Sequence, residues 1–285
     1  TSKDYPNDSL EIGRYESVNE ILHSVHKRGL HLLEHAFVFF SSAASQKTLE
    51  TAEYLCSKNT ANLVNYTGFT NDEYNMVYNS SQMLSSEPRL FFSPKEQVAK
   101  DIVICGSGPS LDENIELLAK LQEDHLIISA ASSFGTLITN NIIPDVLCIL
   151  ERGQFLHEDY KKFVNQEITE KTILVTSAVS DYKLGELFKK RVVFFRPSLT
   201  PLTIFSTSPS QLLPLDGPQA VNTAISLASS LKPNNVLMVG CDLGTLNLDK
   251  VRSITAAGVS PRTFDRQVPA NFGGDCWTDS YMADA

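Results

Sequence analysis

Six short apolar runs recur between residues 101 and 239, and they constrain the fold more than any other feature of the sequence. Unbroken apolar runs of this length are typical of parallel strands that are buried on both faces. Segments with helical spacing separate them, at about 112–122, 132–140, 157–166, 180–189 and 219–231. This alternation predicts an α/β fold with a doubly wound, mostly parallel sheet. The runs place its strands near 101–105, 126–130, 145–150, 172–176, 191–195 and 235–239.

The N-terminal third has a different pattern. Val18, Ile21, Leu22 and Val25 lie at the spacing of one helix face. We therefore expect a helical N-terminal region over residues 1–95 and a Rossmann-like domain over residues 96–285. Because the sequence begins without Met and stops at YMADA, where a helix could start, we also expect a fragment that lacks a C-terminal part.

Charge and composition argue against several classes of partner. The net charge is −9 and no basic run exceeds two or three residues, which disfavours a nucleic-acid partner. No run of 18 apolar residues and no basic-then-apolar N-terminus occurs, so neither a membrane span nor a signal peptide is indicated. The five scattered cysteines include no C-x-x-C pair, which favours a reducing cytoplasm over a disulfide framework.

The stretch DIVICGSGPSLDEN, residues 101–114, joins the first strand to the next helix. Gly106 and Gly108 let the backbone turn sharply and approach a ligand closely. The stretch is not a P-loop, because no lysine follows before Lys120, and Leu111 replaces the third glycine of a dinucleotide fingerprint. The second strand ends in SAASSF without an acid for a ribose, which argues against NAD.

Acidic residues in this loop limit what it can bind. Asp112 and Glu113 would repel a polyphosphate at the start of the helix, so a single phosphate or a ribose suits the loop better. Ser110 and Glu113 also have the spacing of a capping box, and a capped helix without any ligand is the alternative.

Further polar residues follow the other predicted strands, where ligands bind in sheets of this kind. Ser132 and Ser133 follow the second strand, Glu151 the third and Asp242 the last. Gly217, Gln219 and Asn222 lie at the start of the helix at 219–231, whose N-terminus favours an anion. Residues 197–218 are rich in Ser, Thr and Pro, and we interpret them as an irregular lid or a surface excursion.

Four segments, taken in order, resemble one family. GSGPSLDEN is similar to the G-x-G-P-S-L loop of the motility accessory factors, the Maf proteins, which are related to archaeal pterin diphosphokinase-like proteins and bacterial sialyltransferases. The likeness continues through PDVLCILERG, GPQAVNTAISLASSLKPNNVLMVGCDLG and VPANFGGDCWTDS, over roughly residues 60–285. It implies a sialyltransferase-like fold and a cytoplasmic glycosyltransferase. Such an enzyme moves a nonulosonic acid, of the pseudaminic or legionaminic type, from a CMP-sugar to Ser or Thr of flagellin.

The resemblance also implies roles for individual residues. Glycosyl transfer with inversion needs a base, and related sialyltransferases use a His in the final segment, where this chain has none. We therefore expect the catalytic groups among Asp242, Asp275 and Glu151, with Asp279 as a further possible base. The departing phosphate would be met by Arg196, Arg252, Arg262 or Arg266, or by a metal. The residues expected to bind the donor are Gly106, Ser107, Gly108, Pro109, Ser110, Ser132, Ser133, Gly217, Gln219 and Asn222.

Two alternatives remain open at this point. A pterin-type diphosphokinase would need ATP, Mg²⁺ and a carboxylate cluster, which Glu151, Asp242 and Asp275 could supply. A non-catalytic module would keep the fold and bind flagellin without turning over a nucleotide. No metal ligands are assigned, and Mg²⁺ is a possible cofactor.

Overall fold

The computed structural model describes Gln46 and residues 70–98, 100–153, 155–197, 199–214, 217, 219–258, 263–270, 273–279 and 282. The chain divides into two compact units, Thr1–Asp72 and Glu73–Ala285. The helices expected before residue 70 lie outside the described residues, since Gln46 is the one residue of that region that the structure describes. Helix α4 (Thr70–Ser85) and strand β1 (Arg89–Leu90) precede residue 96, where we expect the Rossmann-like domain to begin.

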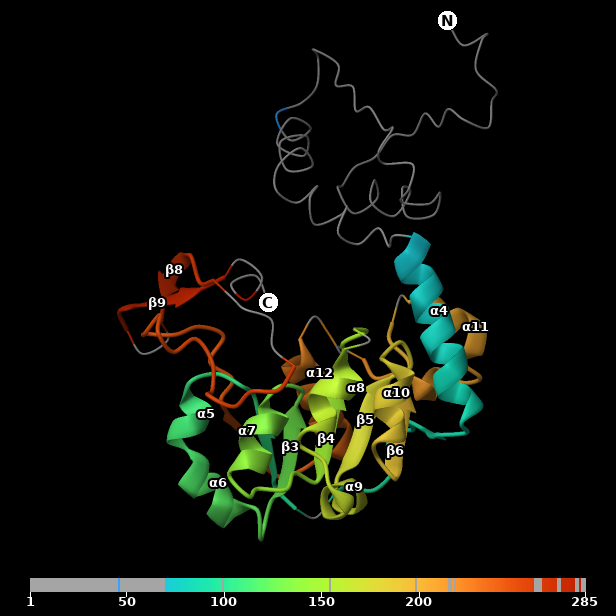
Figure 1. Ribbon diagram of the computed structural model, residues 1–285, viewed down its shortest axis with the longest axis horizontal. Helices are drawn as coiled ribbons and strands as arrows, with labels where there is room; N and C mark the ends of the chain where they lie inside the picture. The colour runs from blue at the N-terminus through green and yellow to red at the C-terminus, as the bar shows by residue number, and fades with distance from the viewer. Residues whose placement is uncertain are drawn as a thin grey trace, which may run out of the picture. The chain divides into compact units, whose positions relative to one another are not determined.

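A seven-stranded parallel sheet forms the centre of the second unit (Figure 1). All six predicted strands are present, and β1 adds a short seventh strand beside β6. The strand order is β1-β6-β5-β4-β3-β2-β7. The six predicted strands are β2 (Ile102–Cys105), β3 (Leu126–Ala130), β4 (Val146–Ile149), β5 (Ile173–Ser177), β6 (Lys190–Phe194) and β7 (Val236–Val239).

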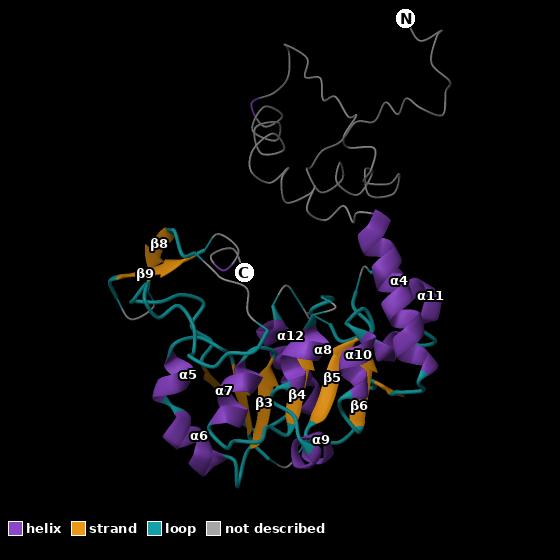
Figure 2. Ribbon diagram, viewed as in Figure 1, coloured by secondary structure: helices purple, strands orange, loops and turns teal. Residues whose placement is uncertain are grey.

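Helices cover both faces of the sheet, as the doubly wound class requires (Figure 2). On one face α12 (Ala220–Leu231) buries Ala224, Leu227 and Ala228 against β2, β3 and β4. Leu147 and Leu174 face the opposite side and pack against the remaining helices there. The helices that follow β2 to β5 are α5 (Ser110–Glu113), α6 (Ile115–Leu121), α7 (Ser133–Thr139), α8 (Leu156–Lys161), α9 (Gln166–Lys171) and α10 (Tyr182–Glu186).

Three helical predictions differ from the structure in detail. The single helix expected at 112–122 is broken at Asn114, whose φ of −114° and ψ of 13° lie outside the helical range. The helix expected at 157–166 ends at Lys161, and Asn165 caps the separate helix α9 by accepting a bond from the Ile168 N–H. The segment expected to be irregular contains α11 (Thr200–Phe205) and a 3-10 turn, Pro209–Gln211.

An antiparallel hairpin, which the sequence did not predict, follows the sheet. Its strands are β8 (Arg266–Pro269) and β9 (Asp275–Thr278), and Gly273 and Gly274 between them adopt positive φ values of 89° and 75°. Backbone bonds of 2.8 Å between Thr245 and Trp277 join it to the loop after β7. Within the part of the chain that the structure describes, no helix has both the length and the apolar character to cross a bilayer.

The strand order locates the site. Strands β3 to β6 extend from β2 in one direction, while β7 lies on the other side of β2. The connections therefore reverse direction between β2 and β7. In open α/β sheets a ligand crevice forms at the carboxyl ends of the strands on either side of such a reversal.

Candidate ligand-binding site

A pocket of about 490 Å³ opens at this carboxyl edge of the sheet. Its volume lies within the range of small-molecule sites, roughly 300–1,000 Å³. The loops after β2, β3, β4, β6 and β7 contribute to its wall, together with the first residues of α12. The polar side chains that line it are Ser107, Ser132, Glu151, Arg152, Arg196, Gln219, Cys241, Asp242 and Arg252.

The glycines of the loop after β2 allow that loop to lie close to the loop after β7. The Gly108 N–H donates to the Gly240 carbonyl at 2.7 Å. A Cβ on Gly108 would lie 2.2 Å from Asp242 Oδ2, and one on Gly106 would lie 2.4 Å from the Gly240 oxygen. Gly240 itself has a φ of 69°. The close approach expected of these glycines is therefore made, in the first place, to the loop after β7.

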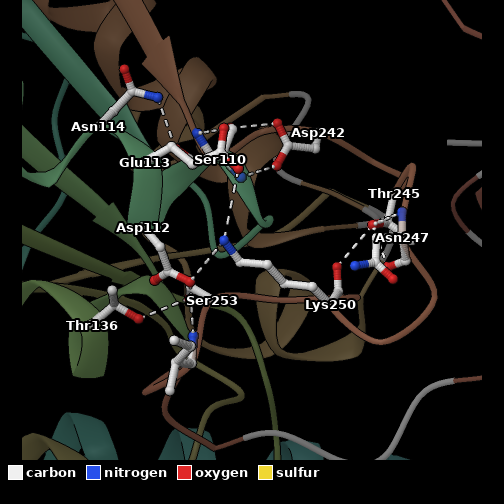
Figure 3. Close-up of polar contacts among 12 residues, drawn as sticks. Ser110, Asp112, Glu113, Asn114, Thr136, Asp242, Thr245, Asn247, Lys250 and Ser253 are labelled. Atoms are coloured by element: carbon white, nitrogen blue, oxygen red, sulfur yellow. Dashed lines mark hydrogen bonds and ion pairs between the residues drawn. The ribbon is translucent and has the colours of Figure 1, made fainter.

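Ser110 and Asp242 fasten the same two loops by their side chains (Figure 3). The Ser110 N–H donates to Asp242 Oδ2 at 2.8 Å, and the Ser110 hydroxyl donates to Oδ1 at 2.6 Å. No side-chain cap forms at the start of α5, so the capping box of Ser110 and Glu113, the alternative given above, is not formed. Asp242 does line the pocket, but both its oxygens are engaged in positioning the loop.

Two hydroxyl groups line the floor of the pocket next to each other. The Ser132 hydroxyl donates to the Ser107 hydroxyl at 2.7 Å, and both residues are only partly buried. Ser133, by contrast, has no exposed surface, and its hydroxyl bonds to the Cys105 carbonyl at 2.7 Å. Ser107 and Ser132 can therefore contact a ligand, whereas Ser133 supports the strands beneath.

Three arginines line the pocket. Arg152 follows β4, Arg196 follows β6, and Arg252 belongs to the segment after β7. Guanidinium groups offer planar sets of donors that match phosphate and carboxylate oxygens. Arg266 lies on β8, outside the pocket wall, and Arg262 falls outside the described residues.

Glu151 is the acidic side chain at the pocket mouth that is least tied to the fold. Its Oε2 accepts a bond from the Leu150 N–H at 3.2 Å, and the residue is exposed. Its charge helps to raise the pKa of Tyr160, although burial of that tyrosine is the larger cause. Asp275 lies on β9 and does not line the pocket, and Asp279 follows the same hairpin strand.

The start of α12 contributes fewer of the expected residues to the pocket wall. Gln219 lines the pocket, and its buried Nε2 atom has no hydrogen-bond partner among the residues that the structure describes. Gly217 instead leaves room for the Arg196 side chain, because a Cβ at Gly217 would lie 2.7 Å from Arg196 Nη2. Asn222, Pro109 and Gly106 are not part of the wall.

Two further lining residues, Arg152 and Phe155, were not among the site residues predicted from the sequence. Phe155 is 54% exposed at the pocket mouth and offers an aromatic face. Both follow β4, so the rule that ligands meet the carboxyl ends of strands could have indicated them.

Cys241 brings a thiol to the pocket wall. Burial raises its pKa to about 11, with a smaller contribution from the charge of Asp242. The thiol is therefore protonated near neutral pH and is a weak nucleophile there.

The acids of the site do not form a metal cluster. Among the described residues, no three His, Cys, Asp or Glu side chains are arranged to hold a metal ion. Glu151 and Asp242 line the pocket without Asp275, so the carboxylate set expected for Mg²⁺ is not assembled there.

Comparison with known proteins adds two findings. Residues 74–247 match the model of a family described as 6-hydroxymethylpterin diphosphokinase MptE-like. A solved structure of a Maf glycosyltransferase from Magnetospirillum magneticum AMB-1 has the same fold, with a TM-score of 0.74 and 23% sequence identity over 93% of this chain. This chain spans 41% of the length of that one. No curated protein matches the sequence.

Proposed function

We propose that the pocket of this chain binds a CMP-activated nonulosonic acid and transfers the sugar to a Ser or Thr hydroxyl of flagellin. The chain belongs to the 6-hydroxymethylpterin diphosphokinase MptE-like family. The relationship expected from the four sequence segments is confirmed by this membership and by the fold shared with a Maf glycosyltransferase. The donor, the acceptor and a cytoplasmic location are proposals that rest on the pocket and on this likeness.

The observation that carries the proposal is the composition of the pocket wall. Three arginines and the Ser107–Ser132 hydroxyl pair face one cavity of about 490 Å³. A CMP-nonulosonic acid carries one phosphodiester and one carboxylate, which suits arginines that come from separate loops. The hydroxyls suit a ribose, and the exposed face of Phe155 suits a ring.

The transfer then requires one base and one stabilised leaving group. The acceptor oxygen forms a bond to the anomeric carbon while the bond from that carbon to the phosphate oxygen breaks. The electron pair of the broken bond leaves with CMP, whose charge the arginines stabilise. We assign the base to Glu151, which takes the acceptor proton, because Asp242 uses both its oxygens on Ser110.

The diphosphokinase reaction is the second candidate, and the family description favours it. Transfer of a diphosphate from ATP usually relies on Mg²⁺ held by carboxylates. In such sites one or two carboxylates hold the ion together with the substrate phosphates. Because Asp242 uses both its oxygens on Ser110, Glu151 is the carboxylate of the described pocket wall that could bind Mg²⁺, and we therefore place glycosyl transfer first.

Mass spectrometry of flagellin after incubation with the chain and CMP-pseudaminic acid tests the proposal. The expected result is a mass gain of one nonulosonic acid residue, together with release of CMP. Glu151→Gln should slow the transfer by about 10²-fold or more, the usual contribution of a general base. Glu158→Gln, which removes an exposed acid of α8 outside the pocket, is the matched control and should leave the rate unchanged.

Two other outcomes would contradict the proposal. Release of AMP from ATP·Mg²⁺ in the presence of hydroxymethylpterin, without sugar transfer, would identify a diphosphokinase. Binding of flagellin with neither product would identify the non-catalytic module.

A further inference from the structure

Residues 250–258, which we call the strap, form an irregular segment that supplies one side of the pocket. Val251, Arg252 and Gly258 line the cavity. The described residues of the strap form no β-strand that pairs with the sheet, so other contacts must hold its backbone in place. Arg252 lies in its first part, and the position of that guanidinium group depends on how the strap is attached.

Contacts with the loops after β2 and β3 hold the middle and the end of the strap. The Ser253 N–H donates to the Ser107 carbonyl at 3.0 Å, and the Ala257 N–H donates to the Ser132 carbonyl at 2.8 Å. The Ser253 hydroxyl lies 2.8 Å from the Thr136 hydroxyl of α7, and both groups are buried. The backbone carbonyl groups of Ser107 and Ser132, whose side chains line the pocket, therefore also hold the strap in place.

Asp112 contacts the strap on both sides of Arg252, and Figure 3 draws its contact with Lys250. Its Oδ2 accepts a bond from the Ile254 N–H at 3.2 Å and lies 3.6 Å from Lys250 Nζ. The Asp112 side chain is only 17% exposed, whereas that of Glu113, 3.7 Å from the same lysine, is 69% exposed. Asp112 thus contacts the residues two before and two after Arg252.

An acid at this position is unexpected beside an anion site, because its charge would repel the ligand. The contacts resolve the conflict. Asp112 is absent from the pocket wall, and its charge is directed to Lys250 and to a backbone N–H. The acidic end of the GSGPSLD loop is therefore used for assembly of the pocket.

We propose that Asp112 is a positioning residue, which fixes the strap so that Arg252 faces the ligand. The identity of that ligand rests on the function proposed above, but the attachment of the strap does not. Asp112 acts through Arg252 and does not touch the ligand itself.

Hydrogen exchange of the full chain without ligand tests the attachment. In Asp112→Ala the amides of Ser253 and Ile254 should exchange about tenfold faster or more, because the Ile254 N–H loses its acceptor. Glu113→Ala removes the neighbouring acid and is the matched control, with little change expected. Unchanged exchange of the strap in Asp112→Ala would overturn the inference. If that variant does not fold, Asp112→Asn takes its place. It keeps an oxygen for Ile254 and loses the attraction to Lys250, so a smaller acceleration is expected.

A double-mutant cycle with CMP as the titrant distinguishes positioning from a general loss of structure. Asp112→Ala and Arg252→Gln should each weaken CMP binding by about tenfold, and the double variant should bind no more weakly than Arg252→Gln alone. Fully additive losses would overturn the inference. Absence of CMP binding by the wild-type chain would contradict the proposed function, and the exchange experiment would then decide the inference alone.

Discussion

Acidic side chains near the carboxyl edge of the sheet differ in function according to what they contact. Asp242 is bound twice by Ser110 and holds two loops together. Glu151 keeps an exposed carboxylate at the pocket mouth. Asp181 is only 1% exposed and caps α10 by accepting a bond from the Lys183 N–H at 3.1 Å. A carboxylate side chain therefore joins two loops, lines the pocket or caps a helix, depending on its neighbours.

The pH dependence of stability should reveal the burial of Asp181. Burial raises the pKa of this carboxyl, and the backbone N–H groups of Lys183 and His157 and the charges of the same two residues oppose that shift. The neutral form is thus favoured in the fold. Its contribution to stability is present below the ordinary Asp pKa of about 3.9 and is lost as pH rises through the raised pKa.

We therefore expect Asp181→Asn to gain stability relative to wild type as pH rises from about 4 towards 7. Urea unfolding at several pH values gives the difference in the free energy of unfolding. Asp124→Asn removes an exposed acid and serves as the control for net charge. A difference that stays constant with pH, or that falls, would show that burial does not dominate at Asp181.

At the scale of elements, α7 and the strap fit together through a glycine. Gly135 lies within α7, where glycine is normally unfavourable. A Cβ at this position would lie 2.3 Å from the Thr255 carbonyl oxygen and 3.0 Å from the Ala257 N atom. Both atoms belong to the backbone of the strap and cannot turn aside as a flexible side chain can. Glycine at this position lowers the intrinsic stability of α7, but it allows the helix to contact the pocket wall closely.

Gly135→Ala should displace the strap. We expect a loss of about 1–3 kcal/mol in the free energy of unfolding, the usual cost of overpacking, together with weaker CMP binding. Gly185→Ala is the matched control in α10, because its Cβ would meet the flexible Met83 side chain at 3.1 Å. Thermal unfolding and CMP titration of both variants measure the effect. Equal behaviour of the two alanine variants would mean that the strap tolerates the added methyl group.

Much of the fold could be predicted from the sequence, because buried parallel strands leave continuous apolar runs. Strand β2, for example, is completely buried over Ile102–Cys105. The two-residue strand β1 is too short to leave such a signal. The residues of the site were harder to predict, because its contacts join distant parts of the chain. The bond between Ile254 and Asp112 spans 142 positions, and that between Ser110 and Asp242 spans 132. No local pattern encodes either bond.

In the whole molecule, the strand order places the pocket, and three arginines line it. The chain carries a net charge of −9, yet the switch point between β2 and β7 opens into a cavity lined by three arginines. Positive groups gathered in a cleft attract an anion even when the whole surface is acidic. We therefore expect anion binding to depend on these arginines and not on a bound metal cluster.

Calorimetric titration of the full chain with CMP and, separately, with ATP·Mg²⁺ measures whether the pocket binds the nucleotide through its arginines. We predict that CMP binds, that Arg252→Gln weakens its binding about tenfold or more, and that Arg89→Gln, an exposed arginine on β1 outside the pocket, leaves it unchanged. Tight binding of ATP·Mg²⁺ without a response to CMP, or CMP binding that is indifferent to Arg252→Gln, would contradict the account.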